Sequence, residues 1–169
     1  MQIVLDYGET GLELDLAGLD ATILSPKFLP GLPDEQASFL EASRNPMGCP
    51  ALRKLIHAKE SVSVVIPDIT RALPNERLLT WLFEELDHVP PENFSIISGT
   101  GTHRANSKEE WHCMIGKRIF EHYTCINHQG FNKDTLSLAG TSLFDYEVYF
   151  NRQYIEADRR ILLLSLIHI

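Results

Sequence analysis

Three short polar segments of the sequence hold side chains that could carry out chemistry. They are Asp-Ile-Thr-Arg at residues 68–71, Gly-Thr-Gly-Thr-His-Arg at residues 99–104 and Asn-His-Gln at residues 127–129. His103 follows a glycine turn, where a histidine is poorly placed for core packing and well placed for proton transfer near neutral pH. Arg71 carries a planar guanidinium that suits a carboxylate or a phosphate. The segments therefore indicate proton transfer, anion binding or both.

Three of these side chains also have an ordinary structural explanation. Asp68 could cap a turn, and Arg71 could be a solvated surface charge. His128 could bond a backbone carbonyl at the end of a strand. Spacing alone leaves the functional and the structural interpretations of these residues open.

The glycines of the second segment form an incomplete phosphate-binding pattern. Gly99 and Gly101 give Gly-x-Gly, but Arg104 occupies the position of the third glycine in a dinucleotide fingerprint, and no Gly-Lys-Ser/Thr is present. A sharp turn that needs a positive φ explains the two glycines equally well. Phosphate cradling is therefore weakly supported.

The elements before and after these segments alternate between strand and helix. Apolar runs at residues 61–67, 93–99 and 123–128 read as buried strands. Amphipathic helices are expected between them, the second over residues 107–123, where Ser107 and Glu110 have capping-box spacing. This alternation predicts an α/β fold with a mostly parallel sheet and flanking helices, which is Rossmann-like. Ligands bind at the carboxyl ends of such strands, so the three polar segments should share one edge.

Further elements are expected towards both ends of the chain. Residues 2–6 and 12–16 flank a glycine turn and predict a β-hairpin. Residues 34–45 predict a helix that ends before Pro46, and a short helix follows it. "YEVYFNRQYI" and "RRILLL" read as two further strands.

Composition excludes several classes of protein. The 169 residues are 44 % hydrophobic, enough for one ordinary core. The net charge of −8 and the lack of a basic block make nucleic acid an unlikely partner. The three cysteines form no Cys-x-x-Cys pair, which suits reduced thiols. Neither a signal peptide nor a membrane span is visible, so the sequence predicts a cytoplasmic protein.

With these residues in view, the chain resembles the N-terminal part of the nickel-pincer-dependent lactate racemase family. The resemblance runs from about Asn45 to Asp158 and rests on five short motifs in the family's order. They are "NPMG", "PDITRALPN", "SGTGTHRANSKEE", "NHQGF" and "FNRQYIEAD".

The resemblance implies a racemase of lactate or a related 2-hydroxy acid. In this family a histidine removes the hydroxyl proton, while the hydride of C2 passes to a nickel-bound pyridinium-derived mononucleotide. The motifs make His103 one of the two acid/base histidines and Asp68 a group that orients the site. Substrate or cofactor contacts are implied for a further set of matched positions, namely Thr70, Arg71, Gly99, Gly101, Arg104 and His128.

The chain departs from the family motifs at three positions. Ile69 replaces a histidine, and Ala72 and Ala105 each replace a proline. Asp68, Arg71 and His103 are retained, but the identity of the hydroxy acid is left open by these changes.

The second histidine, the lysine that carries the cofactor and the nickel ligands would follow residue 163 in the family. We expect residues 1–163 to be an incomplete N-terminal α/β catalytic domain, inactive alone, with the second domain absent. The last six residues, "LSLIHI" at 164–169, match the translation of a transposase sequencing adapter and are expected to be read-through. The missing domain would then be the chain's natural partner.

Two other functions are compatible with the residues. One is a binding module for a phosphate or carboxylate, in which no chemistry follows binding. The other is a metal-independent α/β enzyme in which His103 and Asp68 form the acid/base pair.

Overall fold

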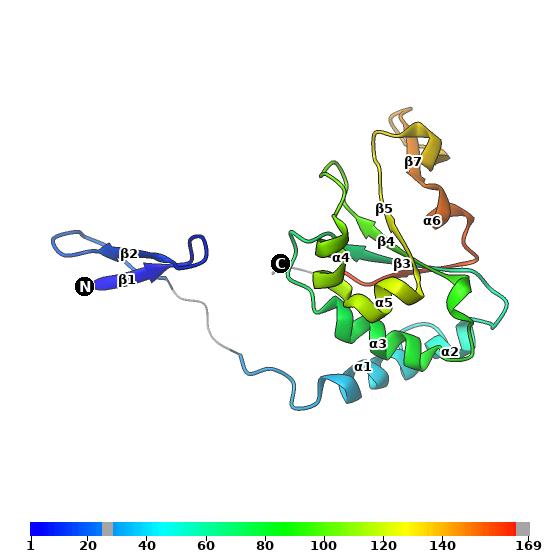
Figure 1. Cartoon of the computed structure of the whole chain (residues 1–169), viewed down its shortest axis with the longest axis horizontal. Helices are drawn as coiled ribbons and strands as arrows, with labels where there is room; N and C mark the ends of the chain where they lie inside the picture. Colours follow the sequence, from blue (N-terminus) through cyan, green and yellow to red (C-terminus); the bar gives the residue numbers. More distant parts are fainter. Residues whose placement is uncertain (25–28, 165–169) are drawn as a thin grey trace. The chain divides into compact units, whose positions relative to one another are not determined.

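A computed structural model of the chain describes residues 1–24 and 29–164 (Figure 1). The predicted read-through segment therefore lies outside the described residues, apart from Leu164. The chain divides into two compact units, Met1–Pro33 and Asp34–Ile169, which are described separately below. None of the described helices is long and apolar enough to cross a membrane.

The first unit contains the predicted β-hairpin. Strands β1 (Gln2–Leu5) and β2 (Leu12–Asp15) pair antiparallel, with Leu5 opposite Leu12. Gly8 and Gly11 in the turn have φ values of 61° and 78°, which an L side chain adopts only with strain. The turn glycines therefore set where the two strands reverse.

The second unit is built on the predicted parallel sheet. Its four strands lie in the order β5-β4-β3-β8, and every neighbouring pair is parallel. The strands are β3 (Val62–Pro67), β4 (Phe94–Gly99), β5 (Thr124–Asn127) and β8 (Arg159–Leu162). The chain runs outwards from β3 to β5 and then returns to add β8 on the other side of β3. Strand order therefore reverses between β3 and β8, where open α/β sheets bind ligands.

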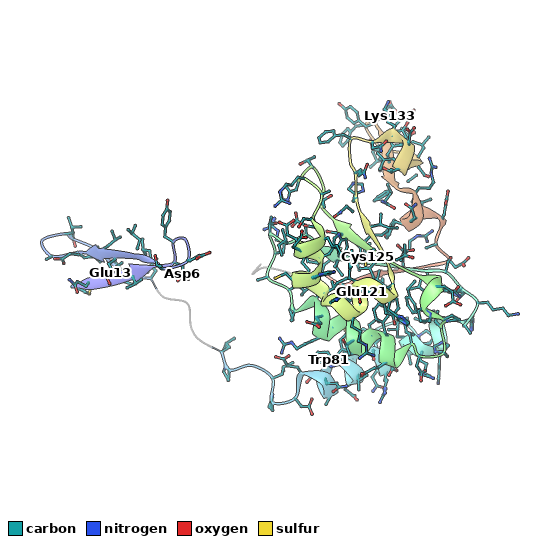
Figure 2. The ribbon with its side chains drawn as sticks, viewed as in Figure 1. Asp6, Glu13, Trp81, Glu121, Cys125 and Lys133 are labelled. Atoms are coloured by element: carbon teal, nitrogen blue, oxygen red, sulfur yellow. The ribbon has the colours of Figure 1, made fainter. Side chains whose placement is uncertain are left out.

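Helices cover one face of this sheet and enclose the core. They are α1 (Glu35–Arg44), α2 (Leu52–Leu55), α3 (Asn75–Glu85), α4 (Lys108–Ile115) and α5 (Lys117–His122), with a short 3-10 turn η1 (Pro91–Asn93) before β4. Leu79 and Leu82 of α3 pack with Val64 of β3 and Ile96 of β4, all at most 1 % exposed. Trp81, labelled in Figure 2, has its ring centroid 5.9 Å from that of Phe39 on α1. The α/β prediction is confirmed.

The other face of the sheet is crossed by the connection from β5 to β8. It contains η2 (Lys133–Thr135), β6 (Leu136–Thr141), β7 (Glu147–Asn151) and α6 (Arg152–Glu156). Tyr154 of α6 lies beside Val65 and Ile97, which alternate with the core-facing positions of their strands. β6 and β7 form a separate antiparallel pair, and β6 was missed in the sequence.

Two predicted elements were wrong in extent. The single helix over residues 107–123 is two helices, because Gly116 takes a φ of 77° and ends α4. The strand expected over "YEVYFNRQYI" ends at Asn151. The Oδ1 atom of Asn151 accepts hydrogen bonds from the backbone N–H groups of Gln153 and Tyr154, at 3.0 and 3.4 Å. An asparagine cap of this kind begins a helix, and α6 follows it.

The core position of Leu79 gives a direct test of this packing. Leu79→Ala should lower the free energy of unfolding by about 2–5 kcal/mol, because it removes a fully buried side chain and leaves a cavity. Leu143→Ala is the control: Leu143 is 99 % exposed and should change stability by less than about 0.5 kcal/mol. Urea unfolding of both variants measures the difference, and equal values would contradict the assigned core.

Candidate active site

The carboxyl edge of the sheet brings Asp68 and His103 together. Asp68 directly follows β3 and is 5 % exposed, while His103 lies in the loop after β4 with its side chain 53 % exposed. The Nδ1 atom of His103 is 2.6 Å from Oδ2 of Asp68. A carboxylate in this position favours the imidazole tautomer with the proton on Nδ1, which leaves Nε2 with a lone pair. The pair is therefore arranged for proton transfer at Nε2.

Thr70 completes the surroundings of the Asp68 carboxylate. Its hydroxyl and its backbone N–H donate to Oδ1 of Asp68 at 2.6 and 3.2 Å. Burial raises the pKa of Asp68, but the hydrogen bonds from Thr70 and His103 outweigh burial. The pKa of Asp68 therefore lies below its ordinary value of 3.8, and the carboxyl is ionised at neutral pH.

The loop that carries His103 is tied down at its start. The hydroxyl of Thr100 donates to the carbonyl of His128 at 2.6 Å, and the N–H of His103 donates to the carbonyl of Thr100 at 2.9 Å. Gly101 has a φ of 58°, so it needs to be glycine for the turn. Gly99 is different: it lies within β4 without a positive φ, and the turn explanation is wrong for it.

A buried amide network at the end of this loop was missed in the sequence. Asn106 is 6 % exposed, and its Nδ2 donates to Oγ of Ser98 at 2.7 Å and to Oδ1 of Asn127 at 3.1 Å. Asparagine is usually a surface residue. The sequence offered no signal for burial at Asn106, although Asn127 stood in a polar segment already singled out.

The two arginines predicted to bind a ligand differ in their surroundings. Arg104 pairs with Glu110 on α4, at 2.7 Å from Nη1 to Oε2 and 2.6 Å from Nη2 to Oε1. Arg104 and the N–H of Ser107 lower the pKa of Glu110 to about 2. The Arg71 side chain is exposed on the loop after β3. Its backbone N–H donates to the backbone carbonyl of Asp68 at 3.1 Å. Arg104 therefore serves the capping box of α4, whereas Arg71 faces solvent.

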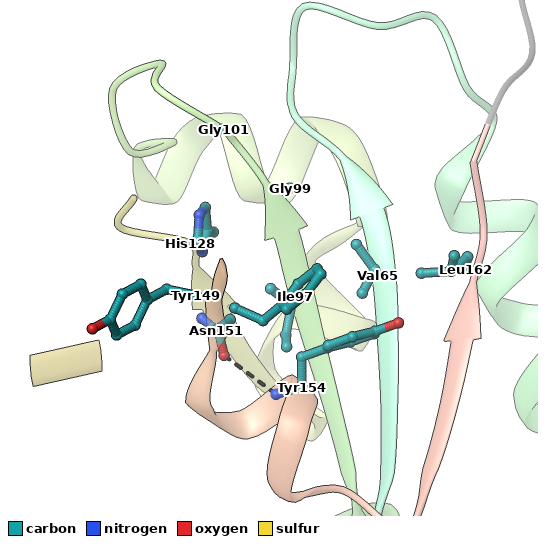
Figure 3. Close-up of a pocket in the computed structure, with 10 residues that line it drawn as sticks. Val65, Ile97, Gly99, Gly101, His128, Tyr149, Asn151, Tyr154 and Leu162 are labelled. Atoms are coloured by element: carbon teal, nitrogen blue, oxygen red, sulfur yellow. Dashed lines mark hydrogen bonds between the residues drawn. The ribbon is translucent and has the colours of Figure 1, made fainter. Parts of the chain in front are cut away.

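The predicted site residues, except Arg71, line one of two hollows. One, of about 290 Å³, is lined by Asp68, Ile69, Thr70, His103, Arg104 and Asn106. The other, of about 460 Å³, lies over the second face of the sheet, and its lining includes Gly99, Gly101, His128, Tyr149 and Tyr154 (Figure 3). No residue lines both hollows. The structure thus groups Thr70 and Arg104 with the Asp68–His103 pair and places His128 and the two glycines elsewhere.

Metal ligands do not gather in the described part of the chain. Among residues 1–24 and 29–164, no three His, Cys, Asp or Glu side chains come together as a metal site requires. The residues of the two hollows therefore do not form a nickel site among themselves.

The Asp68 carboxylate should make stability depend on pH in acid. Its folded pKa is lowered, so its contribution is present above pH 3.8 and is lost as pH falls through the folded pKa. In Asp68→Asn, the free energy of unfolding should fall less than in the wild type between about pH 5 and pH 2. Urea unfolding across this range measures it, with the exposed Asp20→Asn as control. Equal acid slopes for Asp68→Asn and wild type would refute the assignment.

The half-buried His128 should also make stability depend on pH, but closer to neutral pH than Asp68 does. Burial lowers its pKa below the ordinary value of 6.5, so the unfolded chain takes up a proton more readily than the folded one. The folded chain therefore loses stability below pH 6.5, and His128→Gln should remove that loss between about pH 7 and pH 5. Thermal unfolding at several pH values tests this. The exposed His57→Gln should follow the wild-type curve, and a His128→Gln curve that also does so would count against burial of the imidazole.

Comparison with known proteins agrees with the fold and with the family resemblance of the sequence. The lactate racemase of Thermoanaerobacterium thermosaccharolyticum is 27 % identical over 118 residues, 69 % of this chain and 28 % of that protein. The lactate racemase of Lactiplantibacillus plantarum is 25 % identical over 125 residues, 73 % of this chain and 30 % of that protein. The chain therefore spans less than a third of the length of these two relatives.

Solved structures share the fold. The lactate racemase apoprotein from T. thermosaccharolyticum matches 96 % of this chain and 38 % of its own, with a TM-score of 0.72 and 23 % identity. A Thermotoga maritima protein matches 80 % of this chain and 34 % of its own, with a TM-score of 0.59. The model of the lactate racemase N-terminal domain family matches residues 7–168, almost the whole sequence. The chain belongs to the lactate racemase N-terminal domain family.

Proposed function

We propose that this chain is the N-terminal catalytic part of a racemase of lactate or a related 2-hydroxy acid, with His103 as a proton-transfer residue. The observation that carries the proposal is the 2.6 Å contact between Nδ1 of His103 and the buried carboxylate of Asp68. Membership of the lactate racemase family supports the reaction class. The substrate and the activity belong to the whole protein and are part of the proposal.

In this proposal Nε2 of His103 accepts the hydroxyl proton of the substrate. Asp68 holds the proton on Nδ1, which leaves the lone pair on Nε2, and the His103 side chain is 53 % exposed. When Nε2 takes up the proton, the imidazolium forms beside an ionised carboxylate, which stabilises it. The same proton can return to the oxygen when the hydroxyl group is re-formed. Asp68 thus orients His103 and balances its charge without exchanging the proton itself.

Arg71 would bind the carboxylate of the substrate. It stands three residues after Asp68 on the same loop and is exposed. A guanidinium can hold a carboxylate through two parallel hydrogen bonds, which fixes the orientation of the neighbouring hydroxyl carbon. Arg104 is less suited to this task because Glu110 already occupies two of its nitrogens.

The nickel-pincer mononucleotide implied by the family resemblance remains a prediction. The described residues do not gather metal ligands. Inversion at C2 also requires the C2 hydrogen to leave as hydride and return, and this cofactor, when bound in the complete protein, would supply the hydride acceptor. The residues of this chain supply the proton transfer and the carboxylate contact. The rest of the protein would be the partner that completes the site.

Racemisation by the protein that carries this segment tests the proposal. His103→Gln should lower the rate of interconversion of D- and L-lactate by about 10²–10⁴-fold, the usual contribution of a general acid/base. Chiral chromatography of the product measures the rate. His57→Gln is the matched control, because His57 is exposed and lies before β3.

The same assay separates the alternatives. A His103→Gln enzyme that keeps the wild-type rate would exclude His103 as the proton-transfer residue. Lactate binding without turnover in the wild type would favour a binding module. Turnover that survives complete removal of nickel by a chelator would favour a metal-independent enzyme.

A further inference from the structure

Asn106 stands where three loops of the carboxyl edge meet. It is the last residue before Ser107, the N-cap of α4, and so closes the loop that carries His103. Its side chain is bonded to β4 through Ser98, and to the end of β5 through Asn127. Its Oδ1 also accepts the backbone N–H of Ile69, at a long 3.4 Å. Ile69 directly follows Asp68, so one buried amide links the loops of both members of the Asp68–His103 pair.

The contact with Asn127 is reciprocal. The N–H of Asn106 donates to Oδ1 of Asn127 at 3.0 Å, and Nδ2 of Asn127 donates to the carbonyl of Asn106 at 3.0 Å. Both amide hydrogens of Asn106 and its oxygen therefore have partners. A buried polar network in which every group is satisfied holds its members in one arrangement, because any shift leaves a group unpaired.

The second half of the loop is also tied to α4 by the ion pair of Arg104 with Glu110. Residues 101–105 are exposed, and Ala105 places no restriction on φ of the kind a proline would. Thr100 fixes the start of the loop to the carbonyl of His128. Of the contacts that hold the His103 loop in the described part of the chain, the hydrogen bond from Ile69 to Asn106 is the one that reaches the Asp68 loop, besides the Asp68–His103 contact itself.

We infer that Asn106 is a positioning residue, which holds the His103 loop against the Asp68 loop so that Nδ1 of His103 meets the carboxylate. The inference rests on the proposed function for its catalytic meaning, but the geometry of the pair can be measured without any turnover. Asn106 lines the same hollow as the pair, and its proposed role is to set the positions of His103 and Asp68.

The tautomer of His103 reports this geometry directly. In the ¹⁵N-labelled chain, long-range ¹H–¹⁵N spectra at about pH 8, above the usual range of histidine titration, show which ring nitrogen carries the proton. The spectrum of His103→Gln identifies the signals of His103. The wild type should show the proton on Nδ1. Asn106→Ala should lose that preference and give the tautomer mixture of a solvent-exposed imidazole.

Ser61→Ala is the matched control. Its hydroxyl bonds the carboxylate and the N–H of Asp158 at 2.7 and 3.0 Å, at the opposite edge of the sheet. The Ser61→Ala variant should therefore be less stable than the wild type but keep the same tautomer of His103. If Asn106→Ala does not fold, Ser98→Ala removes one partner of the Asn106 amide and should weaken the Nδ1 preference in the same direction.

Three results would overturn the inference, and they are distinguishable. Asn106→Ala with an unchanged Nδ1 signal and a lower melting temperature would show a structural role only. Loss of the signal in both Asn106→Ala and Ser61→Ala would show a general effect of instability. If His103 of the wild type carries no proton on Nδ1, there is no Asp68–His103 pair for Asn106 to position. Of the three results, this is the one that would also contradict the proposed proton transfer.

Discussion

A buried, ionised carboxylate needs hydrogen-bond donors in place of water. Asp68 imposes this constraint on the loops at the carboxyl edge of the sheet. It is nearly fully buried and ionised, so the loops around it must deliver donors to both of its oxygens. Thr70 serves one oxygen from the same loop, and His103 serves the other from the neighbouring loop. The requirement for charge compensation therefore joins two loops that are 35 residues apart in sequence. The position of the candidate base follows from that requirement.

Much of the fold could be predicted because its signals are local. The runs that became β3 and β4 are apolar on both faces, as a buried parallel strand must be, and Ser107 and Glu110 mark the start of α4. Besides the missed strand β6, two elements were predicted with the wrong extent, each because of one residue that sets a backbone angle or a helix cap. Gly116 ends α4 with a left-handed φ, and Asn151 turns a strand into a helix start. Nothing in hydrophobic periodicity reports either event.

The candidate site could be predicted in part, for a different reason. Parallel strands bring their carboxyl ends to one edge, so the gathering of Asp68, His103 and His128 follows from topology alone. Topology does not determine which of the two hollows at that edge each side chain lines. The structure separates His128 and the glycines from the Asp68–His103 pair, and it pairs Arg104 with Glu110 of the α4 capping box. Side-chain direction and pairing between distant residues are decided by packing, which spacing does not encode.

The return of the chain to β8 has a consequence for how the protein is made. β3 is complete at Pro67, yet its second neighbour is formed by Arg159–Leu162, and Ser61 meets Asp158 across 97 residues. During synthesis the far edge of β3 stays unpaired until that late segment has left the ribosome. Such non-local pairing is slow to form, and an open apolar strand edge is a template for association with other chains. Nascent chains of this domain should therefore depend on chaperones more than a domain built from neighbouring strands.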